Sequence, residues 1–328
     1  EKSTKIPKIQ RKTEAFSASF KQFDLFNIRI MPKGKSILLT GATGFLGHHL
    51  LEALVKKSYS VVILKRSTSN PERIVDFAEK IKTYDVDKCD LTTPFKENQI
   101  DLVCHTSTNY GRHLNLDFDV IQSNLIFPLQ LLEMSIEHGV GSFINTDTFY
   151  KPDQTKLKLY ALSKNQFANL LETFSPKIKS VNFELEHVYG ENDSNAKLIP
   201  FVINTLLNNN QQLSLGSGKQ QRDFIYVEDV VSAYLEVIAN IESLPSQFVS
   251  IPIGTGKMTS VKELVLMLRD ICKNSATVLD FDAITEFEGE LEMSKADLES
   301  TQRILNWSPR FSLSDGLEKT VNWFRKHK

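Results

Sequence analysis

The sequence predicts an α/β protein with a doubly wound parallel sheet, followed by a smaller mixed domain. Short apolar runs alternate with segments whose apolar residues recur at helical spacing, and a glycine-rich turn joins the first run to the first such segment. Strands that alternate with helices form a parallel sheet covered on both faces. After Gly190 the alternation becomes irregular. We therefore expect one domain at 31–190 and a second mainly at 191–328, with 224–255 returning to the first.

The individual elements follow from apolar runs and helical periodicity. The four-residue run 61–64 is typical of a buried parallel strand, whereas the apolar spacing over 118–138 is that of a helix. The expected strands are 36–40, 61–64, 102–105, 142–145, 180–184 and 248–253. The expected helices are 45–57, 71–82, 118–138, 160–174, 199–207, 227–239, 261–272, 297–305 and 313–325.

The composition is that of a globular protein. The 328 residues are 41% hydrophobic and 24% charged, with a formal net charge of −1, so no general attraction to nucleic acid or to a membrane surface is expected. No apolar run reaches the roughly 18 residues needed to span a bilayer. The three cysteines lack metal-binding spacing and are typical of reduced thiols in a cytoplasmic protein.

Residues 1–30 are expected to be a leader or tag-like extension outside the fold. Basic residues outnumber acidic ones there. The segment lacks the sustained apolar stretch that a secretory signal requires. The following stretch at 31–35, MPKGK, has the form of a natural start. A partner-binding arm is the alternative.

A glycine motif lies between the first strand and the first helix. The stretch from Thr40 to Gly47 is TGATGFLG, and a strand–turn–helix context is the one in which such a motif indicates dinucleotide binding. Gly41 permits the tight turn, Gly44 lets the backbone approach a pyrophosphate, and Gly47 allows the helix to pack closely on the strand. The helix N-terminus offers free N–H groups to phosphates. A glycine-rich turn without a ligand is the alternative.

A second group of residues has the spacing of a proton-transfer site. Tyr160 and Lys164 are four residues apart on an expected helix and therefore share one face. A lysine charge beside a phenol lowers the phenol's pKa, which would make Tyr160 a general acid or base near neutrality. Thr146 follows a strand 14 residues earlier, at the edge where open α/β sheets bind ligands. A surface Tyr/Lys pair and a turn threonine are the alternative.

Together these features resemble the extended short-chain dehydrogenases/reductases, the NAD-dependent epimerase/dehydratase family that modifies nucleotide sugars. The resemblance runs from about Lys35 to Lys328. It implies a Rossmann domain at 31–190 that binds the dinucleotide, a nucleotide-sugar domain within 191–328, and a homodimer formed through helices 118–138 and 160–174. Besides the glycine motif, the matching stretches are CDL at 89–91, DLVCHTST at 101–108, Asn124, VYG at 188–190, RDFIYVEDV at 222–230 and NWSP at 306–309.

Each site residue has a role implied by this resemblance. Tyr160 carries the proton, Lys164 holds the nicotinamide ribose, and Thr146 binds the reacting oxygen. Asp147 binds a sugar hydroxyl or caps the turn. The implied cofactor-binding residues are Gly41, Thr43, Gly44, Phe45, Leu46, Gly47, Lys65, Arg66, Ser67, Asp90, Leu91, Thr106, Ser107, Thr108, Tyr160, Lys164 and His187. The implied substrate-binding residues are Asn109, Tyr110, Thr146, Asp147, Lys197 and Arg222.

The end of the second strand bears on the choice of cofactor. An NAD enzyme has Asp or Glu there to bind the ribose 2′-hydroxyl, but here the strand is followed by Lys65, Arg66 and Ser67. Two cations and a hydroxyl suit a 2′-phosphate. We therefore predict NADP(H); solvated charges at a strand end are the alternative.

Residues 146–148 bear on the reaction. At this position the nucleotide-sugar 4,6-dehydratases of the family have a stretch like Thr-Asp-Glu, whose two carboxyl groups eliminate water. This chain has Thr-Asp-Thr and therefore lacks one of the two carboxyl groups. The chain most resembles the branch of CDP-abequose and CDP-paratose synthases, although Glu184 and His187 depart from it. That resemblance implies NADPH-dependent reduction of the C4 ketone of a CDP-linked 3,6-dideoxyhexose in O-antigen biosynthesis. The alternatives are a redox-neutral epimerase or dehydratase with bound NAD, and a non-catalytic NADP-binding scaffold.

Overall fold

The computed structural model describes residues 34–111, 117–285 and 291–328. The leader expected at 1–30 lies outside the described residues. Residues Lys33–Lys328 form one compact unit, and the boundary expected at 190/191 stays a prediction. Among the described helices none is long and apolar enough to cross a membrane.

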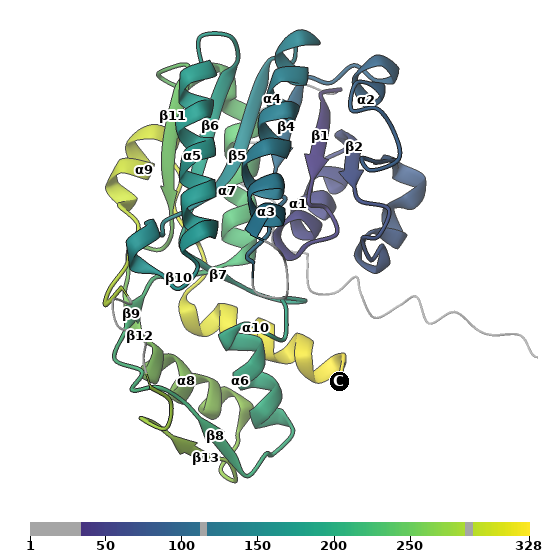
Figure 1. Cartoon of the computed structure of the whole chain (residues 1–328). Coiled ribbons are helices and arrows are strands. Elements are labelled where there is room, and N and C mark those ends of the chain that lie inside the picture. Colours follow the sequence, from purple (N-terminus) through teal and green to yellow (C-terminus); the bar gives the residue numbers. More distant parts are fainter. Residues whose placement is uncertain (1–33, 112–116, 286–290) are drawn as a thin grey trace, which may run out of the picture. The chain divides into compact units, whose positions relative to one another are not determined.

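Seven parallel strands form the central sheet, in the order β11-β6-β5-β4-β1-β2-β3 (Figure 1). The first strand lies in the middle and the chain winds outward from it in both directions, which is the arrangement of a Rossmann fold. The expected α/β class is therefore confirmed. The strands are β1 (Ser36–Thr40), β2 (Ser60–Lys65), β3 (Ile81–Asp85), β4 (Leu102–His105), β5 (Ser142–Thr148), β6 (Lys179–Leu185) and β11 (Phe248–Ile253).

The third strand was not expected. The sequence predicts a helix over 71–82, but the chain forms a 3₁₀ helix, η1 (Glu72–Lys80), and then β3. β3 is the edge strand beside β2, and none of its residues is fully buried. Because an edge strand with so little burial needs no continuous run of apolar residues, its sequence lacks the pattern from which we predicted the other strands.

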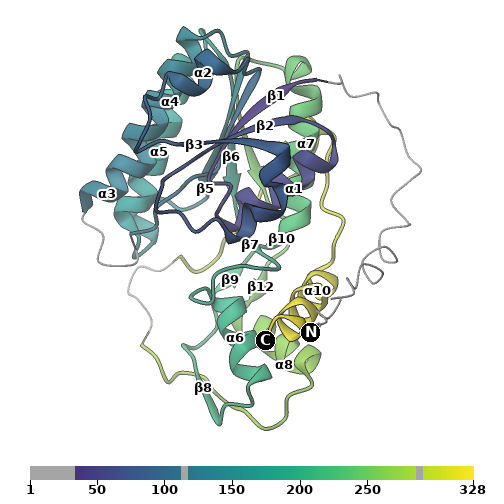
Figure 2. The same cartoon turned by 90° about the vertical axis from the view of Figure 1, so that its right-hand side faces the viewer.

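Helices cover both faces of the sheet (Figure 2). α1 (Phe45–Lys56) and α7 (Val227–Asn240) contact each other on one face, and α4 (Phe127–Glu137) and α5 (Lys158–Phe174) lie on the other. On the second face Phe143 of β5 packs against Phe167 of α5 inside a buried apolar cluster. Burial of each large apolar side chain contributes about 1.5–3 kcal/mol, so this cluster fixes α5 on the sheet. The short helix α2 (Thr93–Glu97) packs at the edge of the cluster through Phe95.

The helix expected at 118–138 is continuous but not uniform. α3 (Asp117–Ile121) passes into a π-helical turn, η2 (Gln122–Ile126), and then into α4. Single π-helical turns are frequent at functional sites. Here the turn carries the buried Asn124, which contacts the loop after β4, as described below.

The second half of the chain builds a smaller lobe at the carboxyl ends of the sheet strands (Figures 1 and 2). Its apolar cluster joins α6 (Leu198–Leu207), α8 (Val261–Cys272) and α10 (Leu313–Lys326). β11 returns to the main sheet and pairs with β6, as expected for part of 224–255. The remaining elements are η3 (Pro152–Gln154), β7 (His187–Tyr189), β8 (Gln212–Ser214), β9 (Gln221–Arg222), β10 (Phe224–Tyr226), η4 (Ile241–Ser243), β12 (Thr259–Ser260), β13 (Val278–Asp280) and α9 (Leu298–Leu305).

Candidate active site

The glycine turn has the geometry that the sequence predicts. Gly41 has a φ of 75°, a value that favours glycine, and the Gly44 N–H donates to the Gly41 carbonyl at 2.8 Å. A Cβ on Gly47 would lie 2.1 Å from the Gly41 carbonyl oxygen, so helix and turn meet too closely for a side chain. α1 then begins at Phe45 without a side-chain cap. Its first N–H groups therefore have no side-chain acceptor, and a bound phosphate would satisfy them.

Arg73 of η1 supports this turn, and sequence reasoning missed it. Its guanidinium donates to the carbonyl of Thr43 at 3.1 Å and to that of Asn192 at 2.6 Å. One side chain therefore links the glycine turn to the loop after β7. No sequence signal marked Arg73, because its partners are backbone carbonyls from distant segments.

The loop after β4 is fixed on both sides. Thr106 Oγ1 donates to the Thr40 carbonyl at 2.7 Å, and the Ser107 N–H approaches Thr40 Oγ1 at 3.3 Å. The buried Asn124 side chain accepts from the Asn109 N–H and donates to the Asn109 carbonyl, both at 2.8 Å. Thr108 Oγ1 lies 3.5 Å from Asn124 Oδ1, and Asn124 Nδ2 also donates to Ser163 Oγ on α5. The residues from 106 to 109 therefore keep a set position between the glycine turn and α5.

Tyr160 and Lys164 are both buried, one helical turn apart on α5. Lys164 Nζ has no hydrogen-bond partner among the residues that the structure describes. Burial lowers the pKa of Lys164 to about 8, while the charge of Asp147 raises it. A buried ammonium without an acceptor is costly, and ribose hydroxyls of a dinucleotide seated on the glycine turn would supply acceptors. Turn and lysine thus fit a nicotinamide dinucleotide.

The expected effect of Lys164 on the phenol is not found. Burial raises the pKa of Tyr160 well above its ordinary value, Tyr110 adds to the rise, and a hydrogen bond with Thr148 opposes it. Lys164 is not among the main influences on the phenol. The prediction that the lysine lowers this pKa was therefore wrong, because desolvation of the phenol outweighs a lysine whose own charge is stabilised by Asp147.

Two threonines at the end of β5 have different partners. Thr146, the predicted ligand of the reacting oxygen, donates to the His105 carbonyl at 2.8 Å and shares a 2.5 Å hydrogen bond with the Tyr234 hydroxyl of α7. The hydroxyl that hydrogen-bonds the Tyr160 phenol is that of Thr148. Sequence reasoning considered Thr148 only as a replacement for a carboxylate. The role of Thr146 stays a prediction, and Thr148 joins it as a candidate.

Asp147 lies between these threonines and is buried. Asn182 Nδ2 of β6 donates to Asp147 Oδ2 at 3.1 Å. Burial raises the pKa of Asp147 and the charge of Lys164 lowers it, so the carboxyl group faces Lys164. Both roles expected for Asp147 stay predictions, because its carboxyl group faces Lys164 and also has a hydrogen bond to the backbone of Thr148 in the turn.

The residues expected at the adenosine end lie together, but two of them already have partners. Lys65 Nζ forms a 2.5 Å ion pair with Asp85, and the Ser67 hydroxyl donates to Asp87 at 2.5 Å. Arg66 is exposed, and no ion pair is found for it within the described ranges. Asp85 is the last residue of β3 and Asp87 comes two residues after it. This strand was not predicted from the sequence.

The next residues of this region hold the start of α2. Asp90 Oδ1 accepts from the Thr92 N–H at 2.8 Å, while Leu91 packs against the apolar cluster of the sheet. Asp90 is exposed, so its carboxyl group is accessible to a ligand.

The predicted substrate residues converge on Tyr160 from several elements. The Tyr110 ring lies 4.9 Å from the Tyr160 ring between centroids. Lys197 Nζ lies 5.0 Å from the ring centre of Phe45 and 6.0 Å from that of Tyr110, and it pairs with Asp193 at 3.1 Å. Leu46 is packed beneath, against the apolar cluster of the lobe. The start of α1, the loop after β4 and the start of α6 therefore meet at the phenol.

Arg222 and His187 lie together at the junction with the lobe. Arg222 is buried and donates to the carbonyl of Gln221 at 2.9 Å and to that of Glu292 at 3.3 Å. His187 Nε2 lies 3.1 Å from the Tyr150 hydroxyl. Burial, Arg222 and Lys197 lower the pKa of His187 to about 3, so this imidazole is neutral at physiological pH.

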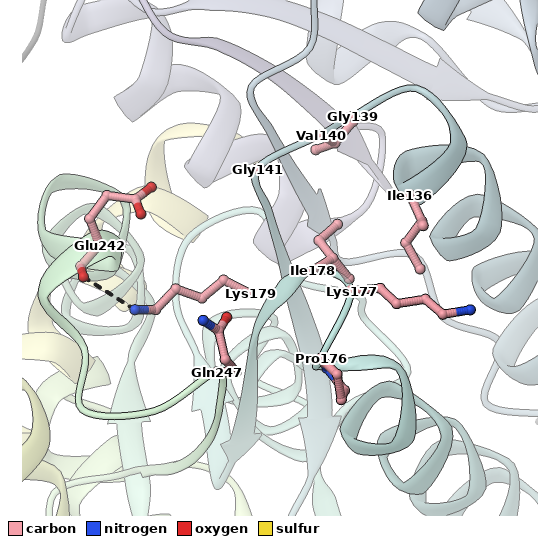
Figure 3. A pocket seen from close by; sticks show the side chains of 10 residues that line it. All are labelled: Ile136, Gly139, Val140, Gly141, Pro176, Lys177, Ile178, Lys179, Glu242 and Gln247. Atoms are coloured by element: carbon pink, nitrogen blue, oxygen red, sulfur yellow. Dashed lines mark hydrogen bonds between the residues drawn. The ribbon is translucent and has the colours of Figure 1, made fainter.

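A separate hollow of about 530 Å³ lies at the opposite edge of the sheet, by the amino ends of β5, β6 and β11 (Figure 3). Lys179 lines it, but its ammonium already donates to the carbonyls of Glu242 and Leu244. In open α/β sheets, ligands bind at the carboxyl ends of the strands. The candidate active site is therefore at the edge that carries Tyr160.

Fold and site together define a class: a dinucleotide-binding α/β protein with a tyrosine and a lysine one helical turn apart at the carboxyl edge of the sheet. The sequence model of the NAD dependent epimerase/dehydratase family matches residues 37–251. The chain belongs to this family, and the resemblance stated from its motifs is confirmed.

Similar proteins support the same assignment. CDP-abequose synthase of Salmonella muenchen is 33% identical over 294 residues, which cover 88% of this chain and 97% of that protein. The structure of UDP-glucose 4-epimerase from Thermotoga maritima with UDP-glucose has a TM-score of 0.77 at 25% identity, covering 89% of this chain and 99% of the other. That of UDP-glucuronic acid 4-epimerase from Bacillus cereus with UDP-glucuronic acid and NAD has a TM-score of 0.76 at 24% identity, covering 89% and 100%.

Proposed function

We propose that this protein is an NADPH-dependent reductase of the C4 ketone of a CDP-linked 3,6-dideoxy-4-ketohexose, in the biosynthesis of O-antigen sugars of lipopolysaccharide. Similarity to CDP-abequose synthase over nearly the whole chain supports the substrate class. The observation that carries the reaction type is geometric: Tyr160 and Lys164 are both buried one helical turn apart on α5, and the Thr148 hydroxyl acts on the phenol. A phenol that holds a proton is prepared to give it to a carbonyl oxygen, which is the proton transfer that a ketone reduction needs.

In this proposal the chain's own residues divide the work. Tyr160 hydrogen-bonds the ketone oxygen and donates its proton, and the Thr148 hydroxyl steadies the phenol. Lys164 stabilises the negative charge that develops on the phenol oxygen and binds the nicotinamide ribose. Bound NADPH supplies the hydride to the carbonyl carbon. Most of the acceleration comes from positioning and from stabilisation of charge in a buried site.

NADPH is preferred over NADH because of Arg66. Its guanidinium is exposed beside the end of β2, and a guanidinium suits a 2′-phosphate. Lys65 and Ser67 contribute less than expected, since Asp85 and Asp87 engage them. Two solved relatives, UDP-glucuronic acid 4-epimerase and MoeE5, hold NAD, which makes this choice a specific target for experiment.

The second candidate is a redox-neutral epimerase with bound NAD, which the similarity to UDP-glucose 4-epimerase favours. Such an enzyme begins by taking a proton from a sugar hydroxyl, a step that requires the ionised phenol. The epimerase later returns that proton to the sugar, so Tyr160 fits both activities and the cofactor balance separates them. The absorbance of tightly bound cofactor in the purified protein, together with the absence of net NADPH consumption, would identify this activity. A non-catalytic scaffold has less support, since both Tyr160 and Lys164 are present.

The test is a screen of 4-keto nucleotide sugars that follows NADPH loss and product configuration. Turnover of the CDP-linked 3,6-dideoxy ketone is the expected result, and Tyr160→Phe should abolish it while cofactor binding stays nearly intact. Tyr84→Phe is the control, because it removes the same hydroxyl from a tyrosine of β3 that is bonded to Glu97 of α2 at 2.7 Å, and its turnover should stay close to that of the wild type. Undiminished turnover in Tyr160→Phe would contradict the mechanism.

We also propose a homodimer that forms through α3, α4 and α5. Phe118 of α3 is 66% exposed and Leu162 of α5 is 43% exposed, and these two helices contact each other within the chain. Such exposed apolar side chains favour a subunit interface. Sedimentation of the wild type and of Phe118→Glu tests the assembly.

A further inference from the structure

Glu186 is the single residue between β6 and β7, and His187 is the first residue of β7, beyond the carboxyl end of β6. The Glu186 N–H donates to the Ile253 carbonyl at the end of β11, at 2.9 Å, and the His187 N–H donates to the Asp223 carbonyl at 3.1 Å. Both backbones are therefore held in place from neighbouring segments. Only 6% of Glu186 is exposed, an unusual state for a carboxyl group.

The two side chains present polar atoms that lack partners. Glu186 Oε2 and His187 Nδ1 are buried and form no hydrogen bond within the part of the chain that the structure describes. They lie 3.7 Å apart, which is too far for a hydrogen bond between them. Buried polar groups nearly always have partners, and leaving each of these unpaired costs about 1–3 kcal/mol. A small polar group that contacts both atoms would satisfy them.

This pair is near the proposed phosphate ligand and is linked to the catalytic phenol through Tyr150. On one side the charge of Arg222 acts on both Glu186 and His187. On the other, His187 Nε2 contacts the Tyr150 hydroxyl, and Tyr150 in turn influences Tyr160. A ligand with its phosphates at Arg222 and its ketone at Tyr160 therefore has its middle portion at Glu186 and His187.

The charge states of the pair select the chemistry of that middle portion. Burial raises the pKa of Glu186 to about 8, with Asp223 adding to the rise and with Ser294 and Arg222 opposing it. The carboxyl group therefore keeps a proton at neutral pH and can donate a hydrogen bond. The neutral imidazole of His187 can accept or donate one. A donor and an acceptor without net charge suit a hydroxyl, which both accepts and donates.

We propose that Glu186 and His187 form a subsite that binds the C2 hydroxyl of the sugar. The inference rests on the proposed function. In a nucleotide-linked 3,6-dideoxy-4-ketohexose, C1 carries the phosphate, C3 and C6 carry no oxygen, and C4 is the ketone. The C2 hydroxyl is thus the single free hydroxyl of the sugar, and it is next to the carbon that bears the diphosphate. A subsite beside Arg222 reaches that position.

The experiment measures binding of CDP, CDP-glucose and CDP-2-deoxyglucose by calorimetry in the presence of NADP⁺. The wild type should bind CDP-glucose about 10-fold more tightly than the 2-deoxy compound, the effect of roughly one well-made hydrogen bond. Glu186→Leu should bring this ratio close to 1 and leave the affinity for CDP unchanged. Glu186→Gln, which keeps a neutral donor, should preserve most of the ratio. The control is Glu184→Gln on β6, a carboxyl group that accepts from Ser250 at 2.6 Å.

The outcomes separate the subsite from the proposed function. Equal binding of CDP-glucose and the 2-deoxy compound by the wild type overturns the subsite, as does a ratio that survives in Glu186→Leu. If UDP- or dTDP-glucose binds in place of CDP-glucose, the base in the proposed function is wrong, and the same ratio measured with that base decides the subsite. Loss of binding to every nucleotide sugar overturns both. If Glu186→Leu does not accumulate as folded protein, the same affinity ratio is measured with Glu186→Gln.

Discussion

The Tyr160 phenol and the Thr148 hydroxyl are hydrogen-bonded at the carboxyl end of β5, whereas Thr146, two residues earlier, bonds the His105 carbonyl and the Tyr234 hydroxyl. Successive side chains of a strand point to opposite faces. Phe143 packs against α5, so Thr146 falls on the face of α7, where Tyr234 meets it. Thr148, the last residue of β5 and still in register with Leu185 of β6, is the threonine that acts on the phenol.

Replacement of each threonine by valine tests which hydroxyl serves the reaction. Thr148→Val should lower kcat by about 100-fold, the loss expected for one positioned hydroxyl in an active site, with little change in cofactor binding. Thr146→Val should change kcat much less and lower the free energy of unfolding by about 1–3 kcal/mol, because it leaves the buried Tyr234 hydroxyl and a carbonyl with fewer partners. Single-turnover kinetics and chemical denaturation measure the two effects. A larger kinetic loss in Thr146→Val would restore the role first predicted for it.

Replacement of Arg66 by alanine tests the cofactor proposal. The change should weaken NADPH binding by at least 10-fold and leave NADH binding nearly constant, since NADPH alone has the 2′-phosphate. Ser67→Ala is the neighbouring control, because its hydroxyl is already bonded to Asp87 and its loss should affect both cofactors little. Fluorescence titration with each cofactor gives the affinities. Equal losses for NADPH and NADH in Arg66→Ala would remove the argument for a 2′-phosphate.

The sequence was sufficient for six of the seven strands of the sheet and for the residues of the glycine turn. There the chemistry is local: an apolar run, a turn that needs glycine and a helix follow one another directly. β3 escaped prediction because it lies at the sheet edge and buries little, and the aspartates that engage Lys65 and Ser67 escaped with it. Arg73 was missed for a related reason, since its partners are backbone carbonyls at Thr43 and Asn192.

The partners of the proposed catalytic residues could not be predicted from the sequence either. A spacing of four on a helix correctly joined Tyr160 to Lys164 on one face of α5. It could not reveal that burial would dominate the pKa of the phenol, nor that Asp147 would face the lysine. Burial and cross-strand contacts depend on the whole fold, so both required the structure.

Asp147→Asn tests the electrostatic link to Lys164. Lys164 is charged below its pKa of about 8 and neutral above it, so kcat should fall as the pH rises through this range. His105, which also faces Lys164, has a pKa well below its usual value because of burial and so stays neutral, and Tyr160 keeps its proton. Since the Asp147 charge raises the pKa of Lys164, its removal should move this fall in kcat to lower pH.

The pH profile of kcat, measured with saturating substrate, is the readout; an unmoved profile would contradict the link. Asn182→Ala, which removes the amide partner of Asp147 but leaves its carboxyl group, is the control.

Glu186 should also make the stability of the protein depend on pH. Its pKa is about 8 in the folded protein, against an ordinary value of 4.5. Between these values the folded state holds a proton that the unfolded chain has lost, so the free energy of unfolding falls as the pH rises through this window. Glu186→Gln has no such proton and should lose less stability between pH 5 and pH 8, by a few kcal/mol at most, because a tenfold difference in proton affinity is worth about 1.4 kcal/mol. Urea denaturation at both pH values, with Glu184→Gln as the partly exposed control on the neighbouring strand, measures this difference. Parallel losses in the wild type and in Glu186→Gln would show that Glu186 is ionised in the folded protein, and a hydroxyl subsite built on its proton would then have no donor.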